Sequence, residues 1–486
     1  MSSTLHNPSR TAIGIDVGTS AVKVIAVAED GEVLERREVA YPLSTPKPGW
    51  SEQNPDDWWA ATEQALEGLT DGVAGIGLSG QMHGLVTLDS SDRPIRPAIL
   101  WNDQRTAAEC EEIEAKVGFD RLVELTGNRA LTGFTAPKLL WLRKHEPDNY
   151  ARIAHVMLPK DYVRLKLTGE RAIDVADASG TLLLDVAKRR WSDEVLRTLE
   201  IDPAWLPTVL ESPEVSGRTS AGIAVAAGAG DQAAGGLGVG VDRPGPLSVA
   251  MGTSGVVFAA LPEYRADPQA RVHAFCHAVP GAWHQMGVML SAAGSLAWLR
   301  SVVGGEFSGL VDEAAAWGPG TDGLTFLPYL TGERTPHADP DARGAFTGLE
   351  IRHNRGALTR AVLEGVACGL RDSFDLVGGG ERGRVSGGGA RSELWLQIVA
   401  SVLEIPLERL AVEEGAAYGA ALLGGVAGGL WSDVHEAVGA CVHTHGQIDP
   451  VPEWIEPYRE LRHRYRALYP ALSTKGLVDT RLSDSV

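Results

Sequence analysis

Apolar segments alternate with turn signals over the first 40 residues of the chain. Two apolar runs at 13–17 and 22–27 enclose Gly-Thr-Ser at 18–20, and Asp-Gly at 30–31 precedes a third segment at 32–39. Runs of this length bounded by turn residues predict strands, and Asp-Gly favours a tight hairpin. We therefore expect three strands joined by two turns.

A helix is predicted after the third strand. Asn54 is a good N-cap residue, and Pro55 suits the first helical position. The carboxylates of Asp56 and Asp57 favour the positive end of the helix dipole. An apolar run at 73–78 predicts the next strand, so the first 80 residues contain three strands, a helix and a strand.

The opening pattern begins again near residue 243. Turn residues at 242–246 lead into an apolar segment at 247–260, which is interrupted by a second Gly-Thr-Ser at 252–254. Two strand-turn-strand segments with the same tripeptide indicate a duplicated domain. We expect an N-terminal domain at 1–243 and a C-terminal domain at 244–486.

The remainder of the second half alternates helix and strand signals. From Leu358 to Phe374, apolar or small residues recur at helical spacing. A strand signal at 384–386 leads into Gly-Gly-Gly at 387–389, and another helix is predicted from Ser392. This alternation predicts a fold of the α/β class.

Length and charge exclude several classes of protein. The chain has 486 residues and a formal net charge of −19. An excess of negative charge argues against nucleic-acid binding, which depends on cationic contacts with phosphates. The length is sufficient for two to four domains at roughly 100–200 residues each. The four scattered cysteines predict no disulfide framework.

The chain contains no segment that is typical of export or of a membrane span. Residues 1–10 are polar and lack the apolar region of a signal peptide. The uncharged stretches at 244–262 and 415–431 contain prolines or too few apolar residues to cross a bilayer. We expect a cytoplasmic protein.

Phosphate binding would have to use an uncommon loop. No glycine precedes a lysine, which excludes a Walker A loop, and the glycines at 228–240 do not form Gly-x-Gly-x-x-Gly. The two Gly-Thr-Ser turns offer backbone N–H groups and hydroxyls as donors instead. Asp16 could hold Mg²⁺ through water, and Lys23 could offset phosphate charge. Two ordinary β-turns are the alternative.

Asp231 is a candidate catalytic base. It ends an apolar, glycine-rich run and precedes a helix of small residues. A phosphoryl-transfer enzyme needs a carboxylate that accepts the proton of the attacking hydroxyl. Aspartate is also a good N-cap residue, so helix capping is an alternative and compatible role.

Two polar clusters suit a sugar, and the first of them follows a predicted strand. They are Gln-Met-His-Gly at 81–84 and Trp-Asn-Asp-Gln-Arg at 101–105. An aromatic ring beside amide and carboxylate groups can bind a polyhydroxylated ligand, although a lone histidine such as His83 can equally be a structural residue. The His and Cys residues at 273–277 and 441–445 lack the spacing of zinc sites, so we expect no metal there.

The motifs together resemble those of the FGGY carbohydrate kinases, a family within the actin, Hsp70 and hexokinase superfamily. The resemblance extends from about residue 12 to about residue 425. It is carried by Ile-Asp-Val-Gly-Thr-Ser at 15–20, Trp-Ser-Glu-Gln-Asn-Pro-Asp-Asp-Trp-Trp at 50–59, Ser-Gly-Gln-Met-His-Gly at 79–84, Ile-Leu-Trp-Asn-Asp at 99–103, Leu-Pro-Lys-Asp-Tyr at 158–162, Gly-Asp at 230–231, Met-Gly-Thr-Ser at 251–254, Phe-Leu-Pro-Tyr-Leu-Thr-Gly-Glu-Arg-Thr-Pro-His at 326–337 and Ser-Gly-Gly-Gly-Ala-Arg-Ser at 386–392. The motifs at 50–53 and 81–84 point to the members that phosphorylate D-xylulose.

The resemblance implies two ribonuclease-H-like, actin-type domains that flank a catalytic cleft, and it suggests a homodimer. It implies ATP- and Mg²⁺-dependent phosphorylation of the 5-hydroxyl of D-xylulose, with Asp231 as the base and Asp16 at Mg²⁺. The expected sugar contacts are Gln81, Met82, His83, Trp101, Asp103, Asp231 and Gln232. The expected ATP contacts are Gly18, Thr19, Ser20, Lys23, Gly252, Thr253 and Ser254, with Gly387, Gly388, Gly389 and Ser392 at the adenine.

Gln232 departs from the family pattern, in which asparagine often follows the catalytic aspartate. Because its side chain is longer and could touch the sugar, a kinase of this family that acts on another ketopentose or on a polyol is an alternative. A non-catalytic, ATP-dependent clamp of the actin or Hsp70 type is the alternative from another class. We assign no role to the residues beyond about 448.

Overall fold

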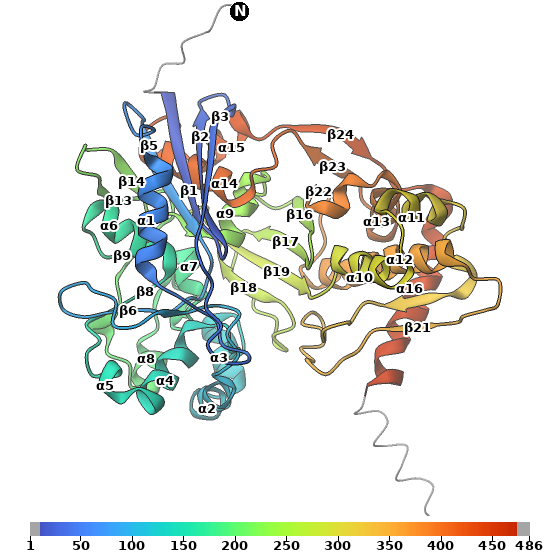
Figure 1. Ribbon diagram of the computed structural model, residues 1–486, viewed down its shortest axis with the longest axis horizontal. Helices are drawn as coiled ribbons and strands as arrows, with labels where there is room; N and C mark the ends of the chain where they lie inside the picture. The colour runs from blue at the N-terminus through green and yellow to red at the C-terminus, as the bar shows by residue number, and fades with distance from the viewer. Residues whose placement is uncertain (1–9, 474–486) are drawn as a thin grey trace, which may run out of the picture. The chain divides into compact units, whose positions relative to one another are not determined.

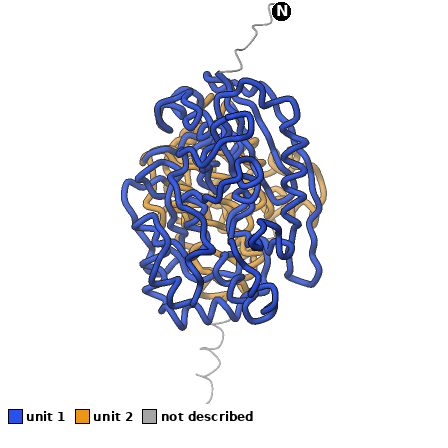
Figure 2. The backbone as a smooth tube through the Cα atoms, turned by 90° about the vertical axis from the view of Figure 1, so that its left-hand side faces the viewer, with its two compact units in different colours: residues 1–243, 260–284, 412–443 blue, residues 244–259, 285–411, 444–486 orange. Residues whose placement is uncertain are grey.

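The computed structural model describes residues 10–473 (Figure 1). The chain forms two compact units (Figure 2). Unit 1 comprises residues 1–243, 260–284 and 412–443, and unit 2 comprises residues 244–259, 285–411 and 444–486. Two segments of the expected C-terminal domain, 260–284 and 412–443, therefore belong to the first compact unit.

The sheet of unit 1 runs in the order β13-β14-β5-β1-β2-β3, and β15 also pairs with β5. Its strands are β1 (Thr11–Val17), β2 (Ala21–Ala28), β3 (Val33–Ala40), β5 (Gly75–Gly80), β13 (Val215–Arg218), β14 (Ala224–Ala226) and β15 (Ala229–Gly230). Strand β1 is antiparallel to β2 and parallel to β5. The predicted order of three strands, a helix and a strand is confirmed, and the short strand β4 (Glu52–Gln53) precedes the helix.

Both faces of this sheet are buried, because side chains alternate across each strand. Ile13 and Ile15 pack in one cluster with side chains of α1 (Pro55–Leu66), which begins at the predicted cap Asn54. Ile25 and Val27 pack in a second cluster with α9 (Asp231–Gly238) and α14 (Gly415–Ala427).

Helix α14 lies directly against the strand backbones. A Cβ placed on Gly14 would lie 2.0 Å from the carbonyl oxygen of Ala417, and one on Gly77 would lie 1.8 Å from that of Ala420. No larger side chain fits at these two strand positions without displacing the helix. The glycines thus fix a close helix-sheet contact beneath the strands that end at residues 17 and 80.

The residues of unit 1 also form the following helices and short strands, of which β18 pairs with β19 at the edge of the second sheet. They are β6 (Val86–Leu88), β7 (Ala98–Ile99), α2 (Ala107–Val117), α3 (Phe119–Thr126), α4 (Thr135–His145), α5 (Pro147–Tyr150), β8 (His155–Met157), α6 (Pro159–Thr168), β9 (Ala172–Asp174), α7 (Val175–Ser179), β10 (Leu184–Asp185), β11 (Arg190–Trp191), α8 (Asp193–Leu199), β12 (Thr208–Leu210), β18 (His273–Cys276) and α15 (Val434–Cys441).

The sheet of unit 2 repeats the strand order of unit 1. This second sheet runs β18-β19-β17-β16-β22-β23-β24, and from β19 onward it matches the order β3-β2-β1-β5-β14-β13 of the first sheet. The bounds of its strands other than β18 are β16 (Pro246–Met251), β17 (Gly255–Leu261), β19 (Trp283–Met289), β22 (Arg382–Ser386), β23 (Leu407–Leu410) and β24 (Thr444–Ile448). In this shared order the third strand is antiparallel to the second and parallel to the fourth. The duplicated pattern and the α/β class are confirmed.

The helices described in unit 2 include the two predicted from sequence, α12 and α13. In chain order, these helices are α10 (Ala293–Val303), α11 (Phe307–Ala315), α12 (Arg355–Leu376), α13 (Glu393–Leu403) and α16 (Pro452–Leu472), and a short pair of strands, β20 (Thr325–Leu327) and β21 (Ala345–Thr347), accompanies them. The helix predicted from Leu358 begins three residues earlier, because Asn354 caps it. Ser392 caps α13 as expected. Among the described residues, no helix is long and apolar enough to cross a membrane.

Candidate active site

The turn at 18–20, between β1 and β2, is held by its carbonyl groups. Its three carbonyl oxygens accept in order from the side chain of Gln81 at 3.2 Å, the side chain of Gln53 at 2.7 Å and the backbone N–H of Tyr41 at 3.2 Å. In a trans peptide, the N–H points opposite to the carbonyl. The following N–H groups are therefore directed away from these partners, as a phosphate-binding turn requires.

Side chains distant in sequence support this turn. The indole N–H of Trp101 donates to the hydroxyl of Thr19 at 3.0 Å. Gln53 accepts from the indole of Trp58 at 3.1 Å and from the side chain of Gln81 at 3.0 Å. Sequence reasoning missed the role of Gln53, since nothing in the pattern links it to a turn more than 30 residues earlier. The Oε1 atom of Gln81 is buried and accepts no hydrogen bond from residues 10–473.

Asp16 lies at the end of β1, next to the turn. Its Oδ1 atom is buried and has no hydrogen-bond partner within the described chain. Burial raises the pKa of Asp16, while the hydroxyl of Ser79 and the ammonium of Lys23 act in the opposite direction. A buried carboxylate oxygen that lacks a donor fits a hard cation such as Mg²⁺.

Lys23 lies opposite Asp16 in the antiparallel pair of β1 and β2. Its Nζ is 3.7 Å from Oε2 of Glu414, a buried carboxylate that Arg36 also contacts. Part of the Lys23 charge is therefore already balanced inside unit 1. Its expected contact with phosphate stays a prediction.

Asp231 is the first residue of α9 and directly follows β15, which pairs with the end of β5. The N-cap residue of this helix is Gly230, and Asp231 is its first helical residue, so the expected N-cap position of Asp231 is wrong. The carboxylate still accepts a hydrogen bond from the backbone N–H of Gln232, which lowers its pKa. Burial, and then the charge of Asp16, raise the pKa of Asp231 to about 7. Gln232 donates to Oδ1 of Asp231 at 3.3 Å. A carboxylate with this pKa is suited to act as a base near neutral pH.

His83 adopts a left-handed backbone conformation, with φ 69°. Its carbonyl accepts from Nζ of Lys138 at 2.9 Å and from the hydroxyl of Thr135 at 3.0 Å. Its ring Nδ1 lies 2.6 Å from the carbonyl oxygen of Gly180. Burial lowers the pKa of Lys138 to about 7. A strained residue that is fixed from two sides is typical of a functional site.

Met82 connects this turn with the candidate base. A Cβ placed on Gly230 would lie 2.8 Å from Cγ of Met82, and one on Gly180 would lie 3.1 Å from its Cε. Met82 therefore packs between these two glycines, one of which immediately precedes Asp231. The structure thus places the Gln-Met-His turn next to the residue before Asp231, and the charge of Asp16 acts on Asp231. The expected contacts of Met82 and His83 with a sugar and the base role of Asp231 stay predictions.

Asp103 is a buried residue whose carboxylate binds other groups of the protein. Its carboxylate is fully buried and accepts three hydrogen bonds from Arg105, two from the guanidinium at 2.9 and 2.6 Å and one from the backbone N–H at 3.0 Å. It also accepts the backbone N–H of Ser51 at 2.7 Å. The guanidinium of Arg105 stacks on Trp50, 3.5 Å from the ring centroid. The expected contact of Asp103 with a sugar thus has no geometric support. Trp101, in contrast, is 42% exposed.

The second turn, at 252–254 in unit 2, is also held by its carbonyl groups. The carbonyls of Gly252 and Thr253 accept the backbone N–H groups of Ala293 and Ala292, both at 2.8 Å. The N–H groups that follow them point the opposite way. Thr253 and Ser254 are exposed and offer their hydroxyls to solvent.

The glycines at 387–389 pack against this second turn. Gly387 has φ 88°, and a Cβ there would lie 2.8 Å from the carbonyl carbon and oxygen of Met251. Only glycine fits this conformation and this close approach. Ser392 uses its hydroxyl to accept the N–H of Trp395 at 3.2 Å. Contacts of these residues with adenine stay predictions.

Comparisons with known proteins agree with this architecture. Residues 11–238 match the model of the N-terminal domain of the FGGY family of carbohydrate kinases, and residues 247–428 match that of the C-terminal domain. A xylulose kinase of Escherichia coli (strain K12) is 42% identical over 480 residues, which cover 95% of this chain and 99% of the relative. One from Lactococcus lactis is 40% identical, with coverages of 94% and 96%.

Solved structures show the same similarity. A structure titled as a xyloylose kinase from Brucella ovis has a TM-score of 0.90 and 42% identity, and the match covers 95% of this chain and 99% of that one. A xylulose kinase from Rhodospirillum rubrum has a TM-score of 0.89 and 33% identity, with the same coverages.

Proposed function

Since this chain belongs to the FGGY family of carbohydrate kinases, we propose that it transfers the γ-phosphoryl group of ATP to the 5-hydroxyl of D-xylulose. The products are ADP and D-xylulose 5-phosphate. The observation that carries the proposal is the position of Asp231, a base with a pKa near 7 that lies beside Asp16 and the Gln-Met-His turn. Relatives that cover nearly the whole chain and carry the name xylulose kinase support the choice of sugar.

Asp231 accepts the proton of the sugar hydroxyl in this mechanism. As the hydroxyl oxygen attacks the γ-phosphorus, the O–H bond breaks toward Asp231 and the bond between phosphorus and the β,γ-bridging oxygen of ATP breaks toward ADP. The pKa of about 7 leaves a large ionised fraction at neutral pH and keeps the carboxylate basic enough to take the proton.

Asp16 holds Mg²⁺ in this proposal, directly or through water. The ion supplies positive charge that neutralises the phosphate oxygens. The N–H groups of the turn at 18–20 and the ammonium of Lys23 bind phosphate oxygens on the same side of β1. Donors at 252–254 bind the phosphates of ATP, and residues 387–389 with Ser392 bind its adenine.

The sugar is bound by polar groups around Asp231. His83 and Met82 lie on the fixed turn, Trp101 offers an exposed aromatic face, and the buried Oε1 of Gln81 offers an acceptor. Gln232 lies beside the base through its 3.3 Å hydrogen bond. Because Gln232 is this close to the reacting group, a related ketopentose or polyol is the second candidate acceptor. The homodimer and the cytoplasmic location also stay predictions.

A substrate panel tests the proposal. ADP release with Mg·ATP is measured for D-xylulose, L-xylulose, D-ribulose, L-ribulose, glycerol, xylitol and D-arabinitol, and ³¹P NMR of the product identifies the phosphorylated position. We expect D-xylulose to exceed each of the others in kcat/KM by about tenfold or more, since a wrong isomer leaves buried polar groups unpaired. Preference for another compound would overturn the choice of sugar, and ATP hydrolysis that no sugar stimulates would favour the clamp.

A further inference from the structure

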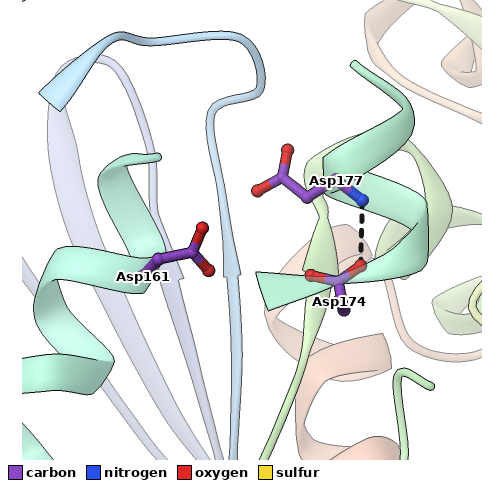
Figure 3. Close-up of side chains that lie close together, drawn as sticks. All are labelled: Asp161, Asp174 and Asp177. Carbon is purple, nitrogen blue, oxygen red and sulfur yellow. Dashed lines mark hydrogen bonds between the residues drawn. The ribbon is translucent and has the colours of Figure 1, made fainter. Parts of the chain in front are cut away.

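Five charged side chains form a fully buried cluster beneath the candidate site in unit 1. They are Lys160, Asp161 and Arg164 of α6, Asp174 of β9 and Asp177 of α7. Figure 3 shows the three carboxylates, which project from two separate segments of the chain toward a common centre. Nothing in the proposed mechanism uses these groups directly.

Lys160 occupies the centre of the cluster. Its Nζ lies 2.6 Å from Asp161, 2.6 Å from Asp174 and 3.1 Å from Asp177. The three carboxylates are close enough to hold a metal ion, but this ammonium group already supplies the positive charge among them. Arg164 adds a second cation, 2.7 Å from Asp161.

The charges balance when one carboxyl group is protonated. Two cations face three carboxylates, so one bound proton makes the cluster neutral. Burial raises the pKa of Asp177 well above its usual range and also raises that of Asp174, so these two carboxyl groups are the ones that favour a bound proton. An uncompensated charge in this fully buried location would be costly.

The cluster contacts the segment that leads into the candidate base. A Cβ on Gly230 would lie 3.1 Å from Oδ1 of Asp177, so this carboxyl group packs against the residue before Asp231. Arg164 donates to the carbonyl of Ala227 at 2.7 Å, at the start of the same glycine-rich segment. Residues 227–230 are thus held at both ends by members of the cluster.

The cluster also reaches the turn that contains His83. Asp174 accepts the N–H of Asp177 at 2.9 Å and so fixes the first turn of α7, the helix followed by Gly180. The carbonyl of Gly180 holds the ring of His83. On the other side, a Cβ on Gly80 would lie 3.1 Å from Cβ of Lys160, so the lysine stem packs where β5 passes into the Gln-Met-His turn.

We propose that Lys160 is a positioning residue for the phosphoryl transfer, because it links α6, β9 and α7 so that Asp231 and His83 keep their orientations toward the sugar. The proposal rests on the roles given above to Asp231 and His83. Replacing buried ion pairs with apolar residues is often neutral or stabilising. The expected benefit of this cluster is therefore a single fixed arrangement of the site, and its loss should appear in the rate of the reaction.

Two variants of Lys160 test the proposal. Lys160→Met removes the link but leaves buried negative charge, whereas Lys160→Met with Asp174→Asn removes the link and keeps the cluster neutral. Lys166→Met is the matched control, since Lys166 lies on the same helix and is exposed. The folded fraction of each protein is determined by circular dichroism and thermal unfolding, and rates are expressed per folded molecule.

We expect the neutral double variant to fold and to lose about 10- to 100-fold in kcat, since small displacements of reacting groups have effects of this size. The KM for ATP should change less than about twofold, because the contacts of the cluster lead to the segments of Asp231 and His83, which are proposed to bind the sugar, while the KM for D-xylulose rises. The acid limb of the pH profile of kcat/KM should move to lower pH, because a displaced Asp231 becomes hydrated and its pKa falls. Lys166→Met should match the wild type.

Three results would overturn the proposal. They are a folded double variant with wild-type kcat and pH profile, a loss of activity that only follows the folded fraction, and a double variant that does not fold. Asp231→Asn is assayed in parallel. If that variant retains wild-type turnover, the base role of Asp231 in the proposed function fails independently of Lys160. If it is inactive while the double variant is fully active, only the positioning role fails.

Discussion

The two Gly-Thr-Ser turns have the same arrangement of strands around them, but the side chains next to them differ in charge. Each joins two antiparallel strands, and each lies beside a third, parallel strand, where Asp16 is in register with Ser79 and Ala250 with Ser386. Across the antiparallel pair, Asp16 faces Lys23, whereas Ala250 faces Val256. Ionisable groups thus flank the first turn, and apolar residues replace them at the second.

The two turns are also held differently. In unit 1 the side chains of Gln53 and Gln81 bind the carbonyls of the first turn. In unit 2 the backbone at the start of α10 binds the carbonyls of the second turn. Both arrangements direct N–H groups outward, and the proposed base Asp231 and the proposed cation ligand Asp16 both belong to unit 1. Within the described residues, the two copies of the pattern thus share the backbone of the turn and differ in the side chains next to it.

Asp231→Asn should have the largest effect, because it removes the proton acceptor. We expect kcat to fall about 10³-fold, within the usual contribution of a general base. The folded pKa of Asp231 is raised, so ionising it costs stability as pH increases from about 4 through about 7. The variant should therefore melt at a higher temperature than the wild type at pH 8 and show little difference at pH 4. Wild-type turnover in a folded Asp231→Asn protein would contradict the assignment.

Asp16→Asn should reduce kcat by about 10²-fold, since it weakens the charge stabilisation at the phosphates. The Mg²⁺ concentration that gives half-maximal rate should also increase. Ala250→Ser, at the corresponding place of the second turn, is the control and should change kcat less than about threefold. Equal effects of the two substitutions would remove the functional distinction between the turns.

The sequence predicted the strands, turns and helices of the site better than the contacts that hold its residues in place. Both Gly-Thr-Ser turns, the cap Asn54 and the helix that starts after Ser392 follow from local patterns, and the structure confirms them. The support of the site depends on contacts between residues that are distant in the chain. These are the hydrogen bonds from the side chains of Gln53 and Gln81 to the first turn, the hydrogen bond from Lys138 to His83, and the ion pairs around Lys160. Periodicity and turn preferences carry no information on such contacts. Asp103 likewise appeared available from its motif, but Arg105 and Ser51 occupy it.

Thr253→Val tests whether the second turn, which lacks flanking ionisable groups, binds a phosphate of ATP through its hydroxyl. Loss of one hydroxyl donor to a phosphate should raise the KM for ATP about tenfold, as expected for a hydrogen bond to a charged group. The kcat and the KM for D-xylulose should change little, because the turn of unit 2 is proposed to bind the nucleotide and not the sugar. A rise in the KM for D-xylulose with unchanged KM for ATP would contradict this division.

Gln232→Asn should have the smallest effect. The shorter amide no longer reaches Oδ1 of Asp231 in the same way, so kcat/KM for D-xylulose should change about threefold, the scale of one weak hydrogen bond. The ratio of kcat/KM for D-xylulose to kcat/KM for D-ribulose and for xylitol should change as well. Identical ratios in the wild type and the variant would show that Gln232 does not contribute to sugar selection.

The pH dependence of kcat/KM for D-xylulose tests the central claim most directly, that Asp231 is a base whose pKa burial and Asp16 have raised. The wild type should show an acid limb with an apparent pKa of about 7, so that activity falls about tenfold for each pH unit below it. In Asp16→Asn the limb should move to lower pH, because the negative charge that raises the pKa of Asp231 is gone. A limb near pH 4 in the wild type, or one that Asp16→Asn leaves in place, would contradict the account.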